Sequence, residues 1–261
     1  MTERLRELAK HRELLYVLTL REIQIRYKQS VLGIAWAILQ PLALMLMFTL
    51  IFSRLLGVST DGYPAPIFYY SALVPWTFFS GSLNRAIPSL ELNAPLIKKI
   101  YFPRELFPLS SVLAAFVDFL IALAILAGMM LYFHTPFTAN ILFLVPVVLI
   151  QIVFTFAICL FASAINVYYR DVKHALPLLI QLWMYASPIV YPVSQIPEGL
   201  KLAYFILNPI AGIIVSYRST LVQGMAPSYP YVATAAAGSL FLFAVCYYLF
   251  KRVEMDFADV V

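Results

Sequence analysis

The sequence predicts an all-α integral membrane protein with six transmembrane helices, and three observations lead to this prediction. Of its 261 residues, 62% are hydrophobic and only 12% are charged, and the mean hydropathy is +0.86. The apolar residues form six long runs, and a helix of about 20 residues is needed to cross a ~30 Å hydrocarbon core. The basic residues lie between these runs. A soluble domain of this length has no interior large enough for so much apolar side chain.

Six stretches are predicted as spans: residues 31–53, 67–87, 106–133, 141–168, 176–192 and 232–250. The fifth is the shortest and contains three prolines, each of which lacks a backbone donor and disturbs a helix. The first 30 residues precede the spans, so the chain divides into residues 1–30 and a membrane domain of residues 31–261.

The distribution of Lys and Arg predicts the orientation, because these residues are retained on the cytoplasmic side. One side carries Arg4, Arg6, Lys10, Arg12, Arg21, Arg26, Lys28, Lys98, Lys99, Arg104, Arg170, Lys173, Lys251 and Arg252. The other side carries only Arg54, Lys201 and Arg218. Both termini are therefore expected in the cytoplasm, which requires an even number of spans. The net charge of +5 fits membrane lipids better than nucleic acid, because the basic residues do not follow one face.

Residues 1–30 are predicted to contain an amphipathic helix that lies in the membrane interface. Leu8, Leu15, Leu18 and Ile25 recur at spacings that place them on one helical face. Arg12, Arg21 and Arg26 would then meet anionic lipid head groups. A helix packed on the cytoplasmic loops is the alternative.

Two further segments outside the spans are predicted to be short helices. The basic loop 89–104 has Asn93 or Ala94 before Pro95 as a helix start, and Pro103 as its stop. Such a helix is suited to dock on a soluble partner. The region 193–231 has two apolar halves, residues 202–207 and 210–215, which are too short to cross and are separated by Asn208 and Pro209. We expect re-entrant or interfacial helices here, on the outer side.

The sequence contains few residues or motifs that indicate catalysis or metal binding. No GxxxxGK[ST], GxSxG or CxxC pattern is present, and the three histidines lack the spacing of metal ligands. We therefore predict no catalytic residues, no metal site and no cofactor in this chain. Asp118 is the one clear acid inside a predicted span, where a functional role and a structural pairing are equally reasonable.

Aromatic residues are spread along the first, second and fifth predicted spans. Many of them belong to the interfacial belts that Trp and Tyr form at membrane surfaces. The deeper residues Trp36, Trp183 and Tyr185 are candidates to line a path along which ring faces slide against sugars.

Four segments in order resemble the permease subunits of type-2 ABC exporters for polysaccharides such as O antigen, capsule or teichoic acid. They are LREIQIRYKQSVLGIAWAILQPL (20–42), NAPLIKKIYFPRE (93–105), YYRDVKHALPLLIQLWMYASPIVYP (168–192) and LNPIAGIIVSYRSTL (207–221). The match spans nearly the whole chain, and the four segments are spread along it in order.

The resemblance implies a homodimer in the inner (plasma) membrane that works with two ABC ATPase subunits, which bind ATP and Mg²⁺. The implied cargo is a lipid-linked glycan. The residues matching the coupling helix that docks on the ATPase are Asn93, Leu96, Ile97, Lys98, Lys99 and Tyr101. Arg26, Tyr27 and Lys28 are candidates to bind the lipid pyrophosphate, since Lys and Arg pair strongly with phosphate, although ordinary positive-inside charge also explains them.

Three alternatives remain open from the sequence. The same architecture serves exporters of other lipids or drugs. A membrane-embedded lipid-sugar transferase would need further catalytic groups beside Asp118, and an ion-driven carrier would need repeated halves and several buried charges.

Overall fold

The computed structural model describes residues 10–28, 33, 35–100 and 102–257, and every regular element in this part of the chain is a helix. The long helices are α2 (Arg12–Tyr27), α3 (Ala35–Phe48), α4 (Ala65–Ala86), α7 (Leu106–Tyr132), α8 (Leu144–Tyr168), α9 (Val172–Ala186) and α12 (Tyr229–Val253). Shorter helices are α5 (Ser89–Leu92), α6 (Ala94–Lys99), α10 (Glu198–Leu207) and α11 (Pro209–Tyr217). Tighter or wider turns extend several of them: η1 (Thr49–Leu55), η2 (Ala139–Phe143), η3 (Val193–Gln195), η4 (Arg218–Val222) and η5 (Glu254–Asp256).

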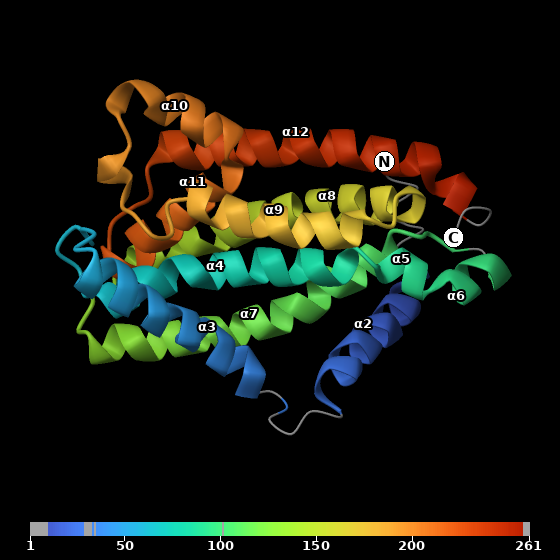
Figure 1. Cartoon of the computed structure of the whole chain (residues 1–261), viewed down its shortest axis with the longest axis horizontal. Coiled ribbons are helices and arrows are strands. Elements are labelled where there is room, and N and C mark those ends of the chain that lie inside the picture. The colour runs from blue at the N-terminus through green and yellow to red at the C-terminus, as the bar shows by residue number, and fades with distance from the viewer. Residues whose placement is uncertain (1–9, 29–32, 34, 101, 258–261) are drawn as a thin grey trace.

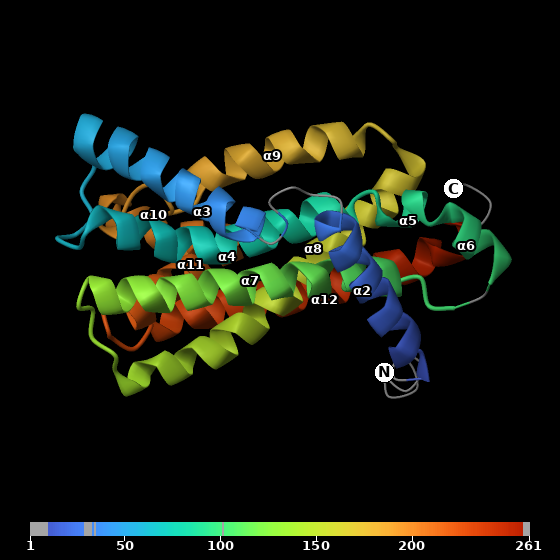
Figure 2. The same cartoon turned by 90° about the horizontal axis from the view of Figure 1, so that it is seen from below.

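The helices form an elongated bundle with two distinct ends (Figures 1 and 2). At one end, on the right in Figure 1, lie α2, α5, α6 and the last turn of α12, and we call this the α6 end. At the opposite end, the α10 end, lie α10 and the connection between η1 and α4. The first and last described elements of the chain therefore lie at the same end of the bundle.

Four helical segments are long and apolar enough to cross a membrane: Ala35–Leu55, Leu106–Tyr132, Ala139–Tyr168 and Tyr229–Asp256. They correspond to the first, third, fourth and sixth predicted spans. A fifth arises if α10 and the segment Pro209–Val222, which meet at 107°, count as one broken span. The bend falls at Asn208, where the sequence predicts a turn between two short helices.

The other two predicted spans are also helical, but they differ from this pattern. Helix α4 has 22 residues, most of them buried, and it packs against α3, α7, α8 and α11. Helix α9 has 15 residues and occupies 172–186 rather than the predicted 176–192. It ends early because Pro188 favours an extended conformation for Ser187 (φ −103°, ψ 154°), which breaks the helix.

Helix α2 packs along α7, and its apolar residues are divided between two environments. Leu18 is buried in a cluster with Leu90 and Ile97, whereas Ile25 is 65% exposed. Tyr16 and Val17 are also exposed. The predicted apolar face of this helix is therefore partly exposed, at Ile25, and partly packed against the bundle, at Leu18. Leu8 of the same predicted face lies outside the described residues.

A buried chain of hydrogen bonds fixes α4 in the centre of the bundle. The Tyr217 hydroxyl donates to Gln151 Oε1 at 2.6 Å, and Gln151 Nε2 donates to the backbone oxygen of Pro75 at 2.9 Å. All three side chains are buried. Polar groups that are buried in an apolar interior need such partners, so this chain fixes the register of α11, α8 and α4.

Candidate functional site

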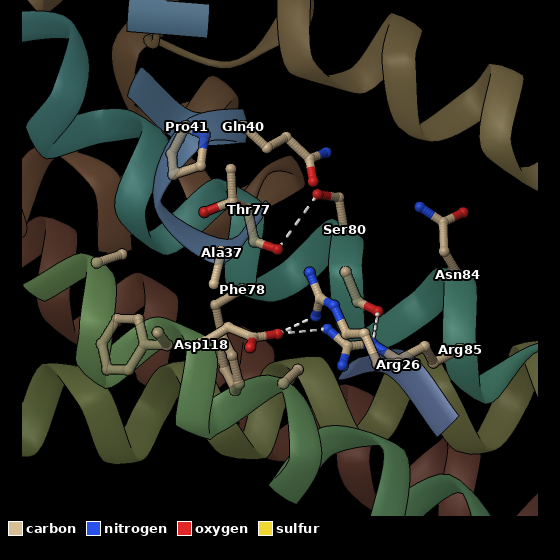
Figure 3. A pocket seen from close by; sticks show the side chains of 14 residues that line it. Arg26, Ala37, Gln40, Pro41, Thr77, Phe78, Ser80, Asn84, Arg85 and Asp118 are labelled. Carbon is tan, nitrogen blue, oxygen red and sulfur yellow. Dashed lines mark hydrogen bonds and ion pairs between the residues drawn. The ribbon is translucent and has the colours of Figure 1, made fainter. Parts of the chain in front are cut away.

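Asp118, halfway along α7, joins three helices through one carboxylate. Arg26 of α2 donates to it, and Arg85 Nη2 of α4 donates to Oδ2 at 2.9 Å (Figure 3). Tyr27 of α2 also donates to it. Arg85 Nε also donates to the backbone oxygen of Gly81 at 3.0 Å, which holds the guanidinium in place. The acid that the sequence singled out therefore has a structural role as the anchor of α2.

The charges at this cluster do not cancel. Arg26 and Arg85 bring two positive charges to one carboxylate, and their side chains are 27% and 20% exposed. Burial, followed by its hydrogen bond to Asp118, raises the pKa of Tyr27 to about 12, so this hydroxyl stays a donor at neutral pH. Among the groups bonded to one another, the two arginines exceed the one carboxylate by one positive charge, and Glu22 of α2 is a further acid that interacts with Arg85.

A cavity of about 90 Å³ adjoins the cluster and is lined by α2, α3, α4 and α7. Its polar wall consists of Gln40, Thr77, Ser80, Asn84 and the two arginines, and Asp118 forms part of the floor (Figure 3). On α4, residues 77, 80, 81 and 84 are spaced to share one helical face. The sequence analysis did not identify this polar face, although Asn84 and Arg85 inside an apolar run were a visible signal.

Of the residues suggested for an anionic head group, Arg26 and Tyr27 are bound to Asp118 and only Lys28 is freely exposed. Lys28 follows the last turn of α2 and lines a surface hollow with Arg21, Gln24 and Ile25. Lys28 therefore lies at the surface, whereas Arg26 and Tyr27 contact Asp118, and Arg26 also lines the cavity beside it.

The α5–α6 segment contains the residues matched to a coupling helix. Asn93 is buried, and its Nδ2 donates to the backbone oxygen of Ser89 at 2.7 Å, which joins α5 to α6. Ile97 is buried and Leu96 is half-buried, whereas Lys98 and Lys99 are exposed at the surface. Tyr101 lies outside the described residues. The segment therefore has an inner face that holds it to the bundle and an outer basic face.

Two ionic contacts lie in this segment and directly after it. Glu91 of α5 accepts from Lys173 Nζ of α9 at 3.0 Å and from Asn166 Nδ2 of α8 at 3.2 Å. The hydrogen bond from Lys173 is the main cause that lowers the pKa of Glu91 below its ordinary value. Sequence reasoning missed this pair, because its members are 82 residues apart.

The second contact holds the end of α12 beneath the segment. Lys251 Nζ lies 2.6 Å from Glu105 and 2.7 Å from Glu254, and Glu254 in turn accepts from the backbone N–H of Arg104 at 2.9 Å. Phe257 is completely buried beside Phe250. The last turn of α12 therefore closes over the chain that leads from α6 into α7.

The three aromatic residues proposed to line a path do not share one environment. Trp36 and Tyr185 are 50% and 47% exposed, on α3 and α9. Trp183 is half-buried, packs on Phe79 with ring centroids 5.3 Å apart, and donates from Nε1 to Asn208 Oδ1 at 2.9 Å. Trp183 therefore holds α9 to the bend between α10 and α11.

Metal binding has no support from the geometry. Within residues 10–28, 33, 35–100 and 102–257, no three His, Cys, Asp or Glu side chains are grouped in a way that would hold a metal ion. Both cysteines are buried and free.

The chain is similar to one family of transport proteins along most of its length. The sequence model described as ABC-2 type transporter matches residues 13–222. The O-antigen export system permease protein RfbA of Klebsiella pneumoniae is 31% identical over 95% of both chains, and RfbA of Myxococcus xanthus is 32% identical over 99% of both. The polysialic acid transport protein KpsM of Escherichia coli is 27% identical over 79% of this chain and 80% of its own.

Proposed function

The chain belongs to the ABC-2 type transporter family, and we infer from this membership that it is the multi-pass membrane permease of a polysaccharide exporter. The observation that carries the inference is similarity along almost the whole chain to permeases named for O-antigen export. A lipid-linked, O-antigen-like glycan is the cargo that we propose, moved across the inner membrane. The same architecture with a teichoic acid, capsule, lipid or drug cargo is the alternative.

We propose six spans, formed by α3 with η1, α4, α7, η2 with α8, α9, and α12, with α10 and α11 re-entrant on the outer side. Helix α4 is the least apolar of the long helices that follow α2, but it is surrounded by other helices and needs little lipid-facing surface. Helix α9 is about 22 Å long at 1.5 Å per residue, and residues 187–192 follow it as turns and bends. Both described chain ends lie at the α6 end, which agrees with an even number of spans and cytoplasmic termini.

Further, we propose that two copies of the chain enclose the channel and that two ATPase subunits, which bind ATP and Mg²⁺, drive it. The chain itself has no phosphate-binding loop motif. The exposed Lys98 and Lys99 on α6 form the docking face, and the buried Asn93 and Ile97 transmit its displacement to the bundle. The exposed rings of Trp36 and Tyr185 face the glycan path, and Lys28 with Arg26 attracts the lipid pyrophosphate.

The docking face is tested by reversing its charge. In Lys98→Glu/Lys99→Glu, co-purification of the ATPase and glycan export should both be lost, because the basic surface becomes acidic. Insertion of the permease in the membrane should be unchanged. Lys10→Glu/Arg12→Glu makes the same change in charge on the exposed start of α2 and is the matched control. Normal export by the Lys98→Glu/Lys99→Glu variant would rule out α6 as the coupling helix.

A further inference from the structure

We propose that the cavity beside Asp118 binds the sugar attached to the lipid pyrophosphate, through hydrogen bonds from Gln40, Ser80 and Asn84. The proposal rests on the proposed function, since a lipid-linked glycan must be the cargo. It adds a binding site for the neutral, hydroxyl-rich part of that cargo, next to the cations that attract its anionic part.

The first argument concerns two amide side chains that face the open side of the cavity. Gln40 of α3 and Asn84 of α4 are exposed, and neither amide has a hydrogen-bond partner among the described residues (Figure 3). A side-chain amide that faces hydrocarbon without a partner costs several kcal/mol, about 4–8 on a water-to-cyclohexane scale. These amides must therefore face water or a polar ligand.

The second argument concerns the shape of the cavity. Its polar groups are arranged along one wall, where the side chains of Gln40 and Ser80 point toward each other (Figure 3). Ala37, Gly81 and Ala115 contribute little bulk, which leaves the space open. At about 90 Å³ the space corresponds to about three waters at ~30 Å³ each, or to the hydroxyl-bearing edge of one sugar ring.

The third argument concerns the aromatic residues of the same cavity. Phe78 and Phe119 line it from α4 and α7, with ring centroids 5.2 Å apart. A sugar presents hydroxyl groups at its edge and C–H groups on its face, so a wall with both amides and aromatic carbon matches both surfaces. An alkyl chain alone would leave the amides without partners.

The fourth argument concerns the charges nearby. Arg26 and Arg85 line the cavity and exceed Asp118 by one positive charge. An anion alone would use these guanidinium groups but not the neutral wall formed by Gln40, Ser80 and Asn84. A bound cation is disfavoured, because Asp118 is the one carboxylate among the lining residues and already accepts from both arginines. A sugar joined to a phosphate uses the neutral and the cationic groups together.

The test compares two probes on the complete permease–ATPase complex in lipid nanodiscs. One is a short polyprenyl pyrophosphate that carries a single N-acetylhexosamine, and the other is the same pyrophosphate without the sugar. We expect the complex to bind the sugar-bearing probe about tenfold more tightly, since two or three neutral hydrogen bonds at ~0.5–1.5 kcal/mol each supply about that factor. Gln40→Ala/Asn84→Ala should reduce the preference to about twofold and leave the affinity for the sugar-free probe unchanged.

Two further variants make the result decisive. Gln195→Ala removes an exposed amide in η3, just before α10, and should keep the tenfold preference. Ser80→Ala removes a single hydroxyl and should lower the preference about twofold, which tests the site even if the double variant fails to fold. Equal binding of both probes by the unmodified complex, or a full preference in folded variants, would overturn the sugar site and leave the exporter function standing. Failure to bind either probe would instead refute a lipid-linked glycan as cargo.

Discussion

The anchor of α2 gives the sharpest stability prediction. Asp118→Asn keeps the shape of the side chain but removes the negative charge that faces Arg26 and Arg85, and it leaves those two guanidinium groups close together. The side chain of Asp118 is 15% exposed, and the two arginines are 27% and 20% exposed. Removal of one partner from a fully buried ion pair costs about 3–5 kcal/mol, whereas an exposed pair is worth at most about 1 kcal/mol. For this partly exposed cluster we expect a loss of about 2–3 kcal/mol.

The loss should appear as a lower melting temperature of the purified permease in detergent. It should also appear as release of α2, measured by spin-label mobility on that helix, because the amide keeps only one of the two oxygens to which Arg26 and Tyr27 donate. Asp171→Asn is the matched control, since Asp171 is exposed at the start of α9 and its side chain forms no hydrogen bond with the described residues. We expect it to cost less than about 0.5 kcal/mol.

A double-mutant cycle separates the ion pairs from packing. Arg26→Gln combined with Asp118→Asn should cost clearly less than the sum of the two single changes, by about 1–2 kcal/mol, because both remove the same interaction. Additive effects, or equal melting temperatures for Asp118→Asn and the unmodified protein, would show that the carboxylate does not anchor α2.

Two other predictions concern α5 and α11. Lys173 lowers the pKa of Glu91 below its ordinary value of 4.5, so the pair stabilises the protein above that pH and loses its effect as the pH falls through the lowered pKa. The unmodified protein should be more stable than Glu91→Gln by about 0.5–1 kcal/mol. This difference in the free energy of unfolding should be constant above about pH 5.5 and shrink below pH 4.5. A difference that persists unchanged to about pH 3 would contradict the prediction. A Cβ on Gly212 would lie 2.7 Å from the backbone oxygen of Tyr231. Gly212→Ala should therefore destabilise α11 against α12 by about 1–3 kcal/mol, whereas Gly128→Ala, with open space around it, should not; equal thermal melts for the two variants would refute the close approach.

Much of the helical framework could be predicted from the sequence because hydropathy and length alone define it. The predicted spans 106–133, 141–168 and 232–250 agree with α7, η2 with α8, and α12 to within three residues at each end. Pro95 correctly marked the start of α6, since proline is tolerated in the first turn, whereas the helix ends at Lys99, before the predicted stop at Pro103. The bounds of the fifth predicted span are displaced, because its helix begins four residues earlier, where Lys173 and His174 lower the hydropathy.

The candidate site was harder to predict because it depends on contacts between distant residues. The sequence indicated that Asp118 needs a partner, but its partners lie 92, 91 and 33 residues away. The polar wall forms because the C-terminal half of α4 faces α3 and α7. Most residues of α4 are buried, so the periodicity of its sequence does not reveal which side of the helix lines a cavity. Arg26 and Tyr27 were found only as basic and aromatic residues near a predicted membrane surface.

The junction between α4 and α5 determines how the docking face acts on the proposed sugar site. Arg85 lines the cavity, and Ser89 begins α5 only four residues later. The two linking residues are held in place: Ile87 is buried and its N–H bonds to Leu83, and the oxygen of Pro88 accepts from Leu92. A hinge here would need a residue free of such contacts. Displacement of α6 by an ATPase is therefore expected to move the C-terminal end of α4. Asn84 and Arg85 would then shift relative to α3 and α7, and the cavity would change shape with each ATPase cycle.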